Sequence, residues 1–92
     1  MIEFDPVKDR ANIEERGLSF RLAEFLFDGP FIEEEDARRA YGEPRFIATG
    51  PIAILDGRIF VVAYTWRGAA RRIISFRKAN DRETRRYLQN IA

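Results

Sequence analysis

The chain contains no cysteine and no histidine among its 92 residues. Without cysteine it can form neither a disulfide framework nor a reactive thiolate. Without histidine it lacks the commonest general acid–base and the commonest metal ligand, and Ser-His or Cys-His catalytic pairs cannot be built. The carboxylates are concentrated in the first 36 residues, away from a basic second half. We therefore expect no metal ion and no cofactor.

Long hydrophobic runs are also missing. No apolar stretch approaches the roughly 20 residues of a transmembrane helix, and the N-terminal sequence has neither the basic start nor the apolar core of a secretory signal. These absences predict a cytoplasmic protein that does not contact a membrane. A hydrophobic content of 46% is typical of a globular chain. The length suits one domain, so we expect residues 1–92 to form a single unit.

Lysine is scarce, and charge is unevenly distributed. Arginine outnumbers lysine fourteen to two. Residues 1–36 hold four basic and eleven acidic side chains, a net of −7, whereas residues 37–92 hold twelve basic and four acidic ones, a net of +8. Arginine binds phosphate and carboxylate through a planar fork. The pattern favours either a polyanion site or two halves that pair with each other in a salt-bridged fold.

Two helices are predicted in the N-terminal third. Asp5-Pro6 opens the first, because aspartate caps a helix and proline suits its first position. Gly17 ends that helix in a position that favours a left-handed residue. Ser19 caps the second, whose closely spaced apolar residues predict a largely buried helix. Gly29-Pro30 stops it.

Strands are predicted next, after an acidic run at Glu33–Asp36 that we expect at the exposed end of a strand or in a loop. The Asp56-Gly57 pair predicts a hairpin between two apolar runs. The expected strands are Arg45–Thr49, Ile52–Leu55, Arg58–Thr65 and Arg71–Arg77. Strict alternation in the last strand gives one face made of Arg72, Ile74 and Phe76, and a more polar face made of Arg71, Ile73, Ser75 and Arg77.

The sequence ends in a predicted helix. Asn80 and Glu83 form a capping box, and the residues at helical spacing that we expect on the sheet are Thr84, Tyr87, Leu88 and Ile91. The order of elements predicts an α+β fold with two N-terminal helices, an antiparallel sheet and a C-terminal helix. With helices on one side, the uncovered face of the sheet is the expected place for a site.

The side chains that remain can still cleave RNA. Arginines on the phosphate oxygens can stabilise the phosphorane electrostatically, and a lysine of lowered pKa or a carboxylate can accept the 2′-hydroxyl proton. This signal is weak by itself, because many small domains carry arginines for solubility.

Several segments resemble the BrnT family. They are Phe4-Asp5 with Lys8 and Asn12, the Gly17 turn with Phe20, Ala23 and Phe27-Asp28, Tyr41–Phe46 with Gly50, Val62–Thr65, and Arg72–Ala79 followed by Glu83 and Tyr87. The Arg-Ile-Ile-Ser-x-Arg-Lys-Ala run is the most specific of them. The resemblance spans nearly the whole chain.

The resemblance implies a RelE-like fold and a ribonuclease toxin of a type II toxin–antitoxin pair. It also implies a BrnA-like antitoxin with a ribbon-helix-helix part, in a complex of two toxins and two antitoxins that represses its own promoter. Promoter DNA is then reached only through the antitoxin, and RNA is the substrate.

Two positions depart from the family pattern. Glu15-Arg16-Gly17 stands where family members often have Lys-His-Gly, so an arginine replaces the histidine. Glu43-Pro44-Arg45 stands where Glu-Glu-Arg or a similar pair is usual. If the histidine takes part in catalysis, this chain is impaired or uses another group.

From the resemblance and the charge pattern we expect a catalytic set of Arg77, Lys78, Arg45, Arg72 and Glu43, and an RNA-binding set of Arg16, Arg71 and Ser75. Arg77 is the first candidate for binding the scissile phosphate, and Lys78 or Glu43 for accepting the proton. Each could instead have a structural role: strand ion pairs for Arg45 and Arg77, or a helix-dipole contact for Arg16. Trp66 could stack on a base, although a place under the last helix is favoured.

Two other functions remain open. A catalytically weak relative could act as a binding module that grips its antitoxin and tunes promoter repression, and Arg16 favours this alternative. A plain nucleic-acid-binding domain is less well supported, because the aromatic residues lie mostly in core-like positions.

Overall fold

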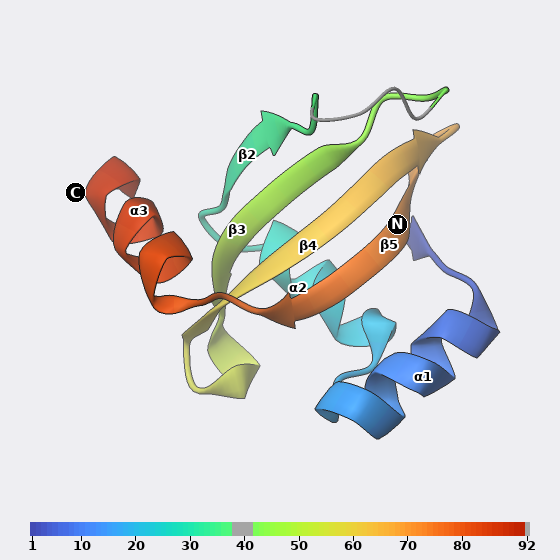
Figure 1. Cartoon of the computed structure of the whole chain (residues 1–92), viewed down its shortest axis with the longest axis horizontal. Helices are drawn as coiled ribbons and strands as arrows, with labels where there is room; N and C mark the ends of the chain where they lie inside the picture. Colours follow the sequence, from blue (N-terminus) through green and yellow to red (C-terminus); the bar gives the residue numbers. More distant parts are fainter. Residues whose placement is uncertain (38–41, 92) are drawn as a thin grey trace.

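The computed structural model describes residues 1–37 and 42–91 (Figure 1). Tyr41 of the family-like segment lies outside these residues. In chain order the elements are β1 (Ile2–Glu3), α1 (Pro6–Arg16), the 3₁₀-helix η1 (Phe20–Leu22), α2 (Ala23–Phe27), β2 (Ile32–Glu35), β3 (Phe46–Ile52), the 3₁₀-helix η2 (Ala53–Leu55), β4 (Arg58–Arg67), β5 (Ala70–Lys78) and α3 (Asp81–Ile91).

The strands form one sheet in the order β1-β5-β4-β3-β2. Neighbours from β2 to β5 are antiparallel, but β1 runs parallel to β5. The α+β class is confirmed, whereas the prediction of a wholly antiparallel sheet is wrong. The cause is that β1 has only two residues, Ile2 and Glu3, which is too short for alternation to signal a strand.

The helix starts and ends follow from local capping. The backbone N–H of Val7 donates to Asp5 Oδ1 at 2.8 Å. Gly17 adopts a left-handed φ of 70°, and its N–H donates to the Ile13 carbonyl. Ser19 caps the second helical segment, which begins as a 3₁₀ turn before α2. These predicted boundaries are confirmed because each depends on residues within one turn of the chain.

The predicted strand at Ile52–Leu55 is wrong. Strand β3 continues to Ile52, and the next three residues form η2. The Gly57 N–H donates to the Ile52 carbonyl, so the chain reverses around η2. Asp56 and Gly57 both have a positive φ, which is the conformation that an Asp-Gly hairpin turn requires. The hairpin therefore exists, but with a longer loop than expected.

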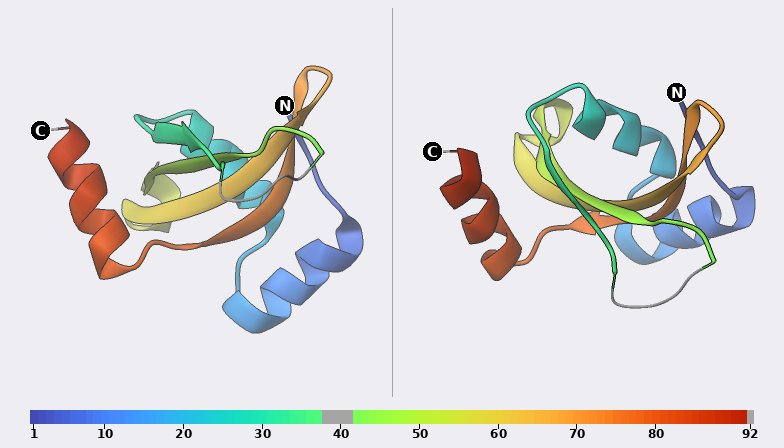
Figure 2. Two further views of the ribbon diagram at one scale, coloured as in Figure 1. Left: turned by 45° about the horizontal axis from the view of Figure 1, so that its top comes forward. Right: turned by 90° about the horizontal axis from the view of Figure 1, so that it is seen from above.

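The core lies between one face of the sheet and the η1–α2 segment. Buried side chains from both layers include Phe20, Ala23, Leu26, Ala48, Val62, Tyr64, Ile73 and Phe76. Figure 2 shows α2 across this face and α1 beside β5. Asn12 of α1 is 5% exposed, and its amide donates to the Phe76 carbonyl at 3.0 Å and to the Leu18 carbonyl at 2.9 Å. The helix is thereby joined to the strand.

Helix α3 does not lie flat on the sheet. It stands beside the ends of β2 and β3 (Figures 1 and 2). Tyr87 is buried, and its hydroxyl donates to the Pro30 carbonyl. Leu88 and Ile91 are 52% and 50% exposed. The prediction that they pack on the sheet is therefore wrong, because the helix contacts the sheet through a narrower stripe.

A β-bulge in β5 changes which residues share a face. Ser75 pairs with Ala63 and Ile73 pairs with Tyr64, so Ile74 is skipped. As a result Ile73 and Phe76 both face the core, at 2% and 0% exposed. The expected faces are correct for residues 75–77 and reversed for residues 71–73.

In the part of the chain that the structure describes, no helix has the length and apolarity needed to span a bilayer.

Candidate functional site

A groove of about 460 Å³ lies on the sheet face opposite the core. Its lining residues are Ile32, Glu34, Glu35, Asp36, Ala37, Ile47, Thr49, Val61, Ala63, Ser75, Arg77, Glu83 and Arg86. The strand register brings them into two rows across the sheet: Ile32, Thr49, Val61 and Arg77, and Glu34, Ile47, Ala63 and Ser75. The middle positions of the two rows are uncharged, with Thr49 and Val61 in one row and Ile47 and Ala63 in the other.

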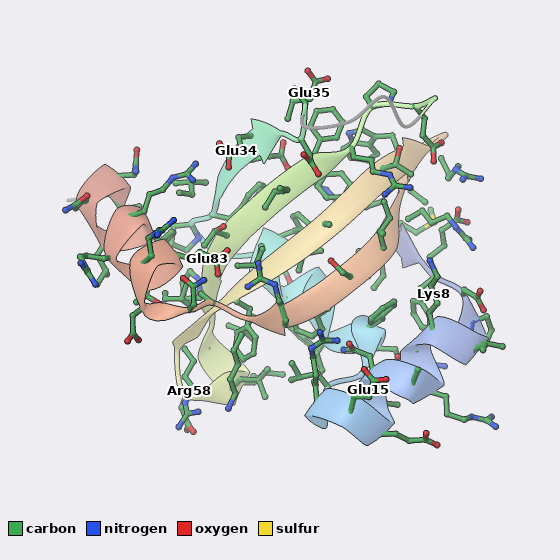
Figure 3. All side chains as sticks on the ribbon, in the orientation of Figure 1. Lys8, Glu15, Glu34, Glu35, Arg58 and Glu83 are labelled. Carbon is green, nitrogen blue, oxygen red and sulfur yellow. The ribbon has the colours of Figure 1, made fainter. Side chains whose placement is uncertain are left out.

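Charged side chains from three elements flank this floor. Glu34 and Glu35 come from β2, Arg77 comes from β5, and Glu83 with Arg86 comes from α3. Figure 3 shows Glu83 between α3 and the sheet, with the two glutamates along β2. The groove therefore has a small, partly apolar floor and a charged rim.

Arg77 is held in a fixed position at this rim. Its Nη1 and Nη2 donate to the two carboxylate oxygens of Glu83 at 2.7 and 2.8 Å. Its Nη1 also lies 3.2 Å from the Lys78 carbonyl. Two parallel hydrogen bonds to one carboxylate set both the position and the plane of a guanidinium. The arginine is thus oriented before any substrate binds.

Glu83 also caps α3. Its Oε1 accepts from the Asn80 backbone N–H at 2.9 Å, and the Glu83 N–H donates to Asn80 Oδ1 at 2.8 Å, which confirms the predicted capping box. The hydrogen bonds from Arg77 lower the pKa of Glu83 to about 2, against a partial rise from burial and with a further lowering by the Asn80 N–H. Glu83 is therefore a poor proton acceptor and a good structural anion.

Two further contacts fix α3 as a wall of the groove. Arg86 Nη2 lies 2.7 Å from Glu34 Oε2, which joins α3 to β2. Tyr87 is bound to the Pro30 carbonyl just before β2, and burial raises the pKa of its hydroxyl. The wall thus depends on contacts to β5 and to β2, the strands that lie on either side of β4 and β3.

Ser75 and Arg77 lie in the groove, as their predicted polar face requires. Lys78 does not line it. It is exposed, and its register partner is Phe60 of the core face, so Lys78 and Arg77 are on opposite sides of β5. The structure therefore separates two residues that the sequence placed side by side.

Arg72 shares the outer face with Arg77 because of the bulge. Its partner Thr65 is four residues from Val61, the partner of Arg77. At about 3.3 Å per residue, the two arginines are about 13 Å apart along the sheet. Arg72 Nη1 lies 3.7 Å from Glu3 of β1.

Glu43 and Arg45 lie at the far end of the sheet from Arg77. The Thr65 hydroxyl donates to the Pro44 carbonyl at 2.7 Å, which anchors this segment beside β4. Glu43 lies 3.4 Å from Arg67, at the end of β4. Because Arg67 is six residues from Val61, Glu43 is about 20 Å from the groove end that holds Arg77.

Arg71 and Arg16 also lie outside the groove. The Arg71 guanidinium carbon is 4.0 Å from the centre of the Phe27 ring and 4.6 Å from that of Trp66, on the core face. Arg16 Nη1 donates to Asn12 Oδ1 at 2.8 Å, beside the edge of β5. Of the eight site residues expected from sequence, the structure brings two together in the groove.

The sequence did not identify several groove residues. Glu83 was named as a helix cap and a family-like residue and Glu34 as part of an acidic run, but neither was assigned to the site. Arg86 and Thr49 were not singled out. The spacing of Glu83 and Arg86 at i and i+3 places them on one side of a helix, which was a usable signal. The residues at 1–37 and 42–91 contain no cluster of three or more carboxylates suited to a metal ion. The groove chemistry available is thus guanidinium, hydroxyl and carboxylate.

Comparison with known proteins identifies the family. Residues 4–83 match the family model of the ribonuclease toxin BrnT of type II toxin–antitoxin systems. The 1.1 Å crystal structure of the Brucella abortus ribonuclease toxin BrnT is similar, with 28% sequence identity and a TM-score of 0.62 over 87% of this chain and 96% of that one. No curated protein sequence matches the chain. Because the family model spans all of β2 to β5 and most of the chain, the chain belongs to the BrnT family of ribonuclease toxins of type II toxin–antitoxin systems.

Proposed function

We propose that this protein is a metal-independent endoribonuclease toxin that cleaves RNA in the outer-face groove and is neutralised by a BrnA-like antitoxin. One observation carries the proposal. Arg77 is oriented by a bidentate contact at the rim of a groove whose floor is made of uncharged side chains. A preoriented guanidinium beside open space is suited to a phosphate that gains charge in the transition state.

The proposed reaction is an attack of a ribose 2′-oxygen on the adjacent phosphorus. The 2′-hydroxyl loses its proton as the O2′–P bond forms, the P–O5′ bond breaks, and the leaving 5′-oxygen takes up a proton. The products are a 2′,3′-cyclic phosphate and a 5′-hydroxyl. Arg77 binds the phosphate oxygens, and Ser75 donates a hydrogen bond beside it. Arg72, about 13 Å along the same face, binds a neighbouring part of the RNA backbone.

The proton acceptor is proposed among the carboxylates of the groove rim, Glu34 and Glu35. The sequence-based candidates, Lys78 and Glu43, lie on the other face and at the far end of the sheet. We assign Lys78, with Arg45 and Arg16, to wider electrostatic attraction of RNA, and Glu43 to its ion pair with Arg67. Such attraction raises association rates without a direct role in bond cleavage.

The test is cleavage of a 5′-labelled RNA by purified protein in excess chelator. The wild type should cleave, and Arg77→Ala should lose about 10²-fold in rate, the usual loss for one transition-state donor. Arg85→Ala is the matched control, because Arg85 is an exposed arginine of α3 that does not line the groove. Replacing the 2′-hydroxyl at the cut site by hydrogen should block cleavage. Activity restored only by magnesium or manganese would refute the metal-independent mechanism.

The antitoxin is proposed to cover the same face. An acidic or extended segment laid across the groove would neutralise Arg72 and Arg77. Addition of the antitoxin should shift the amide signals of residues 71–78, and unchanged signals would contradict this placement. We further propose a complex of two toxins and two antitoxins, with promoter DNA bound only through the antitoxin and the complex located in the cytoplasm.

A second function has an observation in its favour. Both Nη atoms of Arg77 contact Glu83, and Arg16 occupies the position where family members often have histidine. A toxin whose arginine stays bound to its own carboxylate would act as a catalytically weak module that grips the antitoxin. Expression without the antitoxin separates the two: growth arrest supports the enzyme, and normal growth with soluble protein supports the module.

A further inference from the structure

Trp66 lies at the exposed end of β4 on the core face of the sheet. It is 44% exposed and is the chain's single tryptophan. The favoured expectation, that it sits under the last helix, is wrong: α3 stands at the opposite end of the sheet (Figure 1). The structure therefore leaves a large indole ring in contact with solvent.

The ring is nevertheless held in place. Trp66 pairs across the strands with Arg71, whose guanidinium carbon lies 4.6 Å from the indole centre. Tyr64 packs edge-on against the ring, with centroids 5.6 Å apart. Arg71 lies in turn 4.0 Å from the Phe27 ring of α2. An indole stacked on an arginine that is itself stacked on the core loses little further freedom when a ligand binds.

The β5 bulge creates this arrangement. Without the extra residue at Ile74, strict alternation would place Arg71 on the same face as Arg77. The bulge turns Arg71 to the core face, where it meets Trp66. Among the described residues, Arg71 Nε is buried without a hydrogen-bond partner, so contacts with aromatic rings contribute much of what holds this guanidinium.

Two further arginines lie next to Trp66 and Arg71 in sequence, on the outer face of the sheet. Arg67 follows Trp66 directly and is 52% exposed, and Arg72 follows Arg71. Each contacts one carboxylate, of Glu43 and Glu3 respectively. Arg71 also lies 5.3 Å from the centre of the Tyr64 ring, whose hydroxyl donates to the Glu33 carboxylate. The guanidinium is thus held among aromatic rings next to the exposed indole. Aromatic rings combined with arginine are the usual stacking surface for unpaired bases.

We propose that Trp66 and Arg71 form a stacking platform for an unpaired nucleobase of single-stranded RNA. This rests on the proposed function and adds a binding site remote from the groove. Trp66 is five residues from Val61 along β4, or about 17 Å, and lies on the opposite face of the sheet, so an RNA strand needs more than about five nucleotides at stacked spacing to reach it from the groove. An RNA strand that leaves the groove past Arg72 reaches the platform over the β4–β5 turn. The stack accepts any base, because every base has a π-face.

The test uses the fluorescence of Trp66 together with the anisotropy of a labelled oligonucleotide. The probe is an oligonucleotide of eight nucleotides with 2′-O-methyl riboses, which lacks the attacking hydroxyl. We expect its binding to quench Trp66, and we expect an abasic chain of equal length, a duplex and a trinucleotide to bind without that quenching. By anisotropy, Trp66→Ala should weaken binding about 5- to 150-fold, the range for loss of one stacked base, and Trp66→Phe should recover most of it.

Phe25→Ala is the matched control, because Phe25 is 45% exposed and lies on α2. It should change the affinity less than about twofold, and far-UV circular dichroism should show that all variants fold. Saturating RNA binding with unchanged Trp66 fluorescence would overturn the platform and leave the ribonuclease proposal standing. Equal quenching by the abasic chain, or quenching only by a partner protein, would also overturn it. Absence of binding by any RNA would refute both the platform and the proposed function.

Discussion

The contact between Arg77 and Glu83 should contribute to the free energy of unfolding, and the substitution Glu83→Gln tests this. Glu83→Gln keeps the shape of the side chain, and its amide oxygen can still accept from the Asn80 N–H. The new amide nitrogen faces the Arg77 fork as a second donor, so the bidentate pair is lost. The variant should therefore be less stable than the wild type at neutral pH.

The magnitude follows from the pKa of Glu83, which falls from 4.5 to about 2. A lowering of that size corresponds to about 3 kcal/mol at face value. The Arg77 side chain is 40% exposed and that of Glu83 is 26% exposed, so solvent screens the pair and we expect a loss of about 1–2 kcal/mol.

The pH dependence has a definite sign. Because folding lowers the pKa of Glu83, its contribution is fully present above pH 4.5, the ordinary value, and is lost as pH falls through about 2. The glutamine variant lacks this titration. The difference in unfolding free energy between the two proteins should therefore be constant from about pH 8 to pH 5 and should shrink below that.

Urea unfolding monitored by far-UV circular dichroism at pH 7, 5, 4 and 3 measures this difference. Glu34→Gln is the control, because its pair with Arg86 is about half exposed on both sides and should contribute less than about 0.5 kcal/mol. Equal losses in the two variants, or a Glu83→Gln loss that does not depend on pH between 5 and 3, would refute the reasoning.

Three other substitutions test packing. Phe76→Ala should cost about 3–5 kcal/mol, because Phe76 is fully buried against Phe60; a loss under 1 kcal/mol in urea unfolding would contradict the assigned face. Asn12→Ala should cost about 2 kcal/mol, since two buried carbonyls lose their donor, and a melting temperature equal to wild type would show that water replaces the amide. Gly50→Ala should cost about 1–3 kcal/mol, because the new Cβ would lie 2.9 Å from Phe31 Cβ; an unchanged unfolding midpoint would mean that Phe31 moves aside at no cost.

Much of the local structure could be predicted because its causes are local. A capping side chain acts on a backbone group two or three residues away, as Asp5 does at α1 and Asn80 does at α3. The Asp56-Gly57 signal likewise depends on the conformations that these two residues prefer. The alternation of polar and apolar residues also predicted correctly that Phe76 faces the core and Arg77 the outer face, because β5 pairs regularly with β4 at these positions.

The candidate site was predicted less well, because its geometry depends on distant pairing. The bulge at Ile74 exists only in relation to β4, and it exchanged the faces of Arg71 and Arg72. Lys78 follows Arg77 in sequence but points away from it, since successive strand residues lie on opposite faces. Glu43 was predicted to share a site with Arg77 from its charge and from the family pattern. Neither of these gives the distance between two residues in the fold.

By itself, the sequence determined the capped helix boundaries, the α+β class and, through its family resemblance, the kind of protein. These depend on interactions within one turn or on motifs that can be read in order. Only the tertiary structure decided that Glu83 binds Arg77, that Arg86 meets Glu34, and that Trp66 stacks on Arg71 in solvent. Such contacts are set by the strand register and by the position of α3 beside the sheet, and both depend on the packing of the whole sheet.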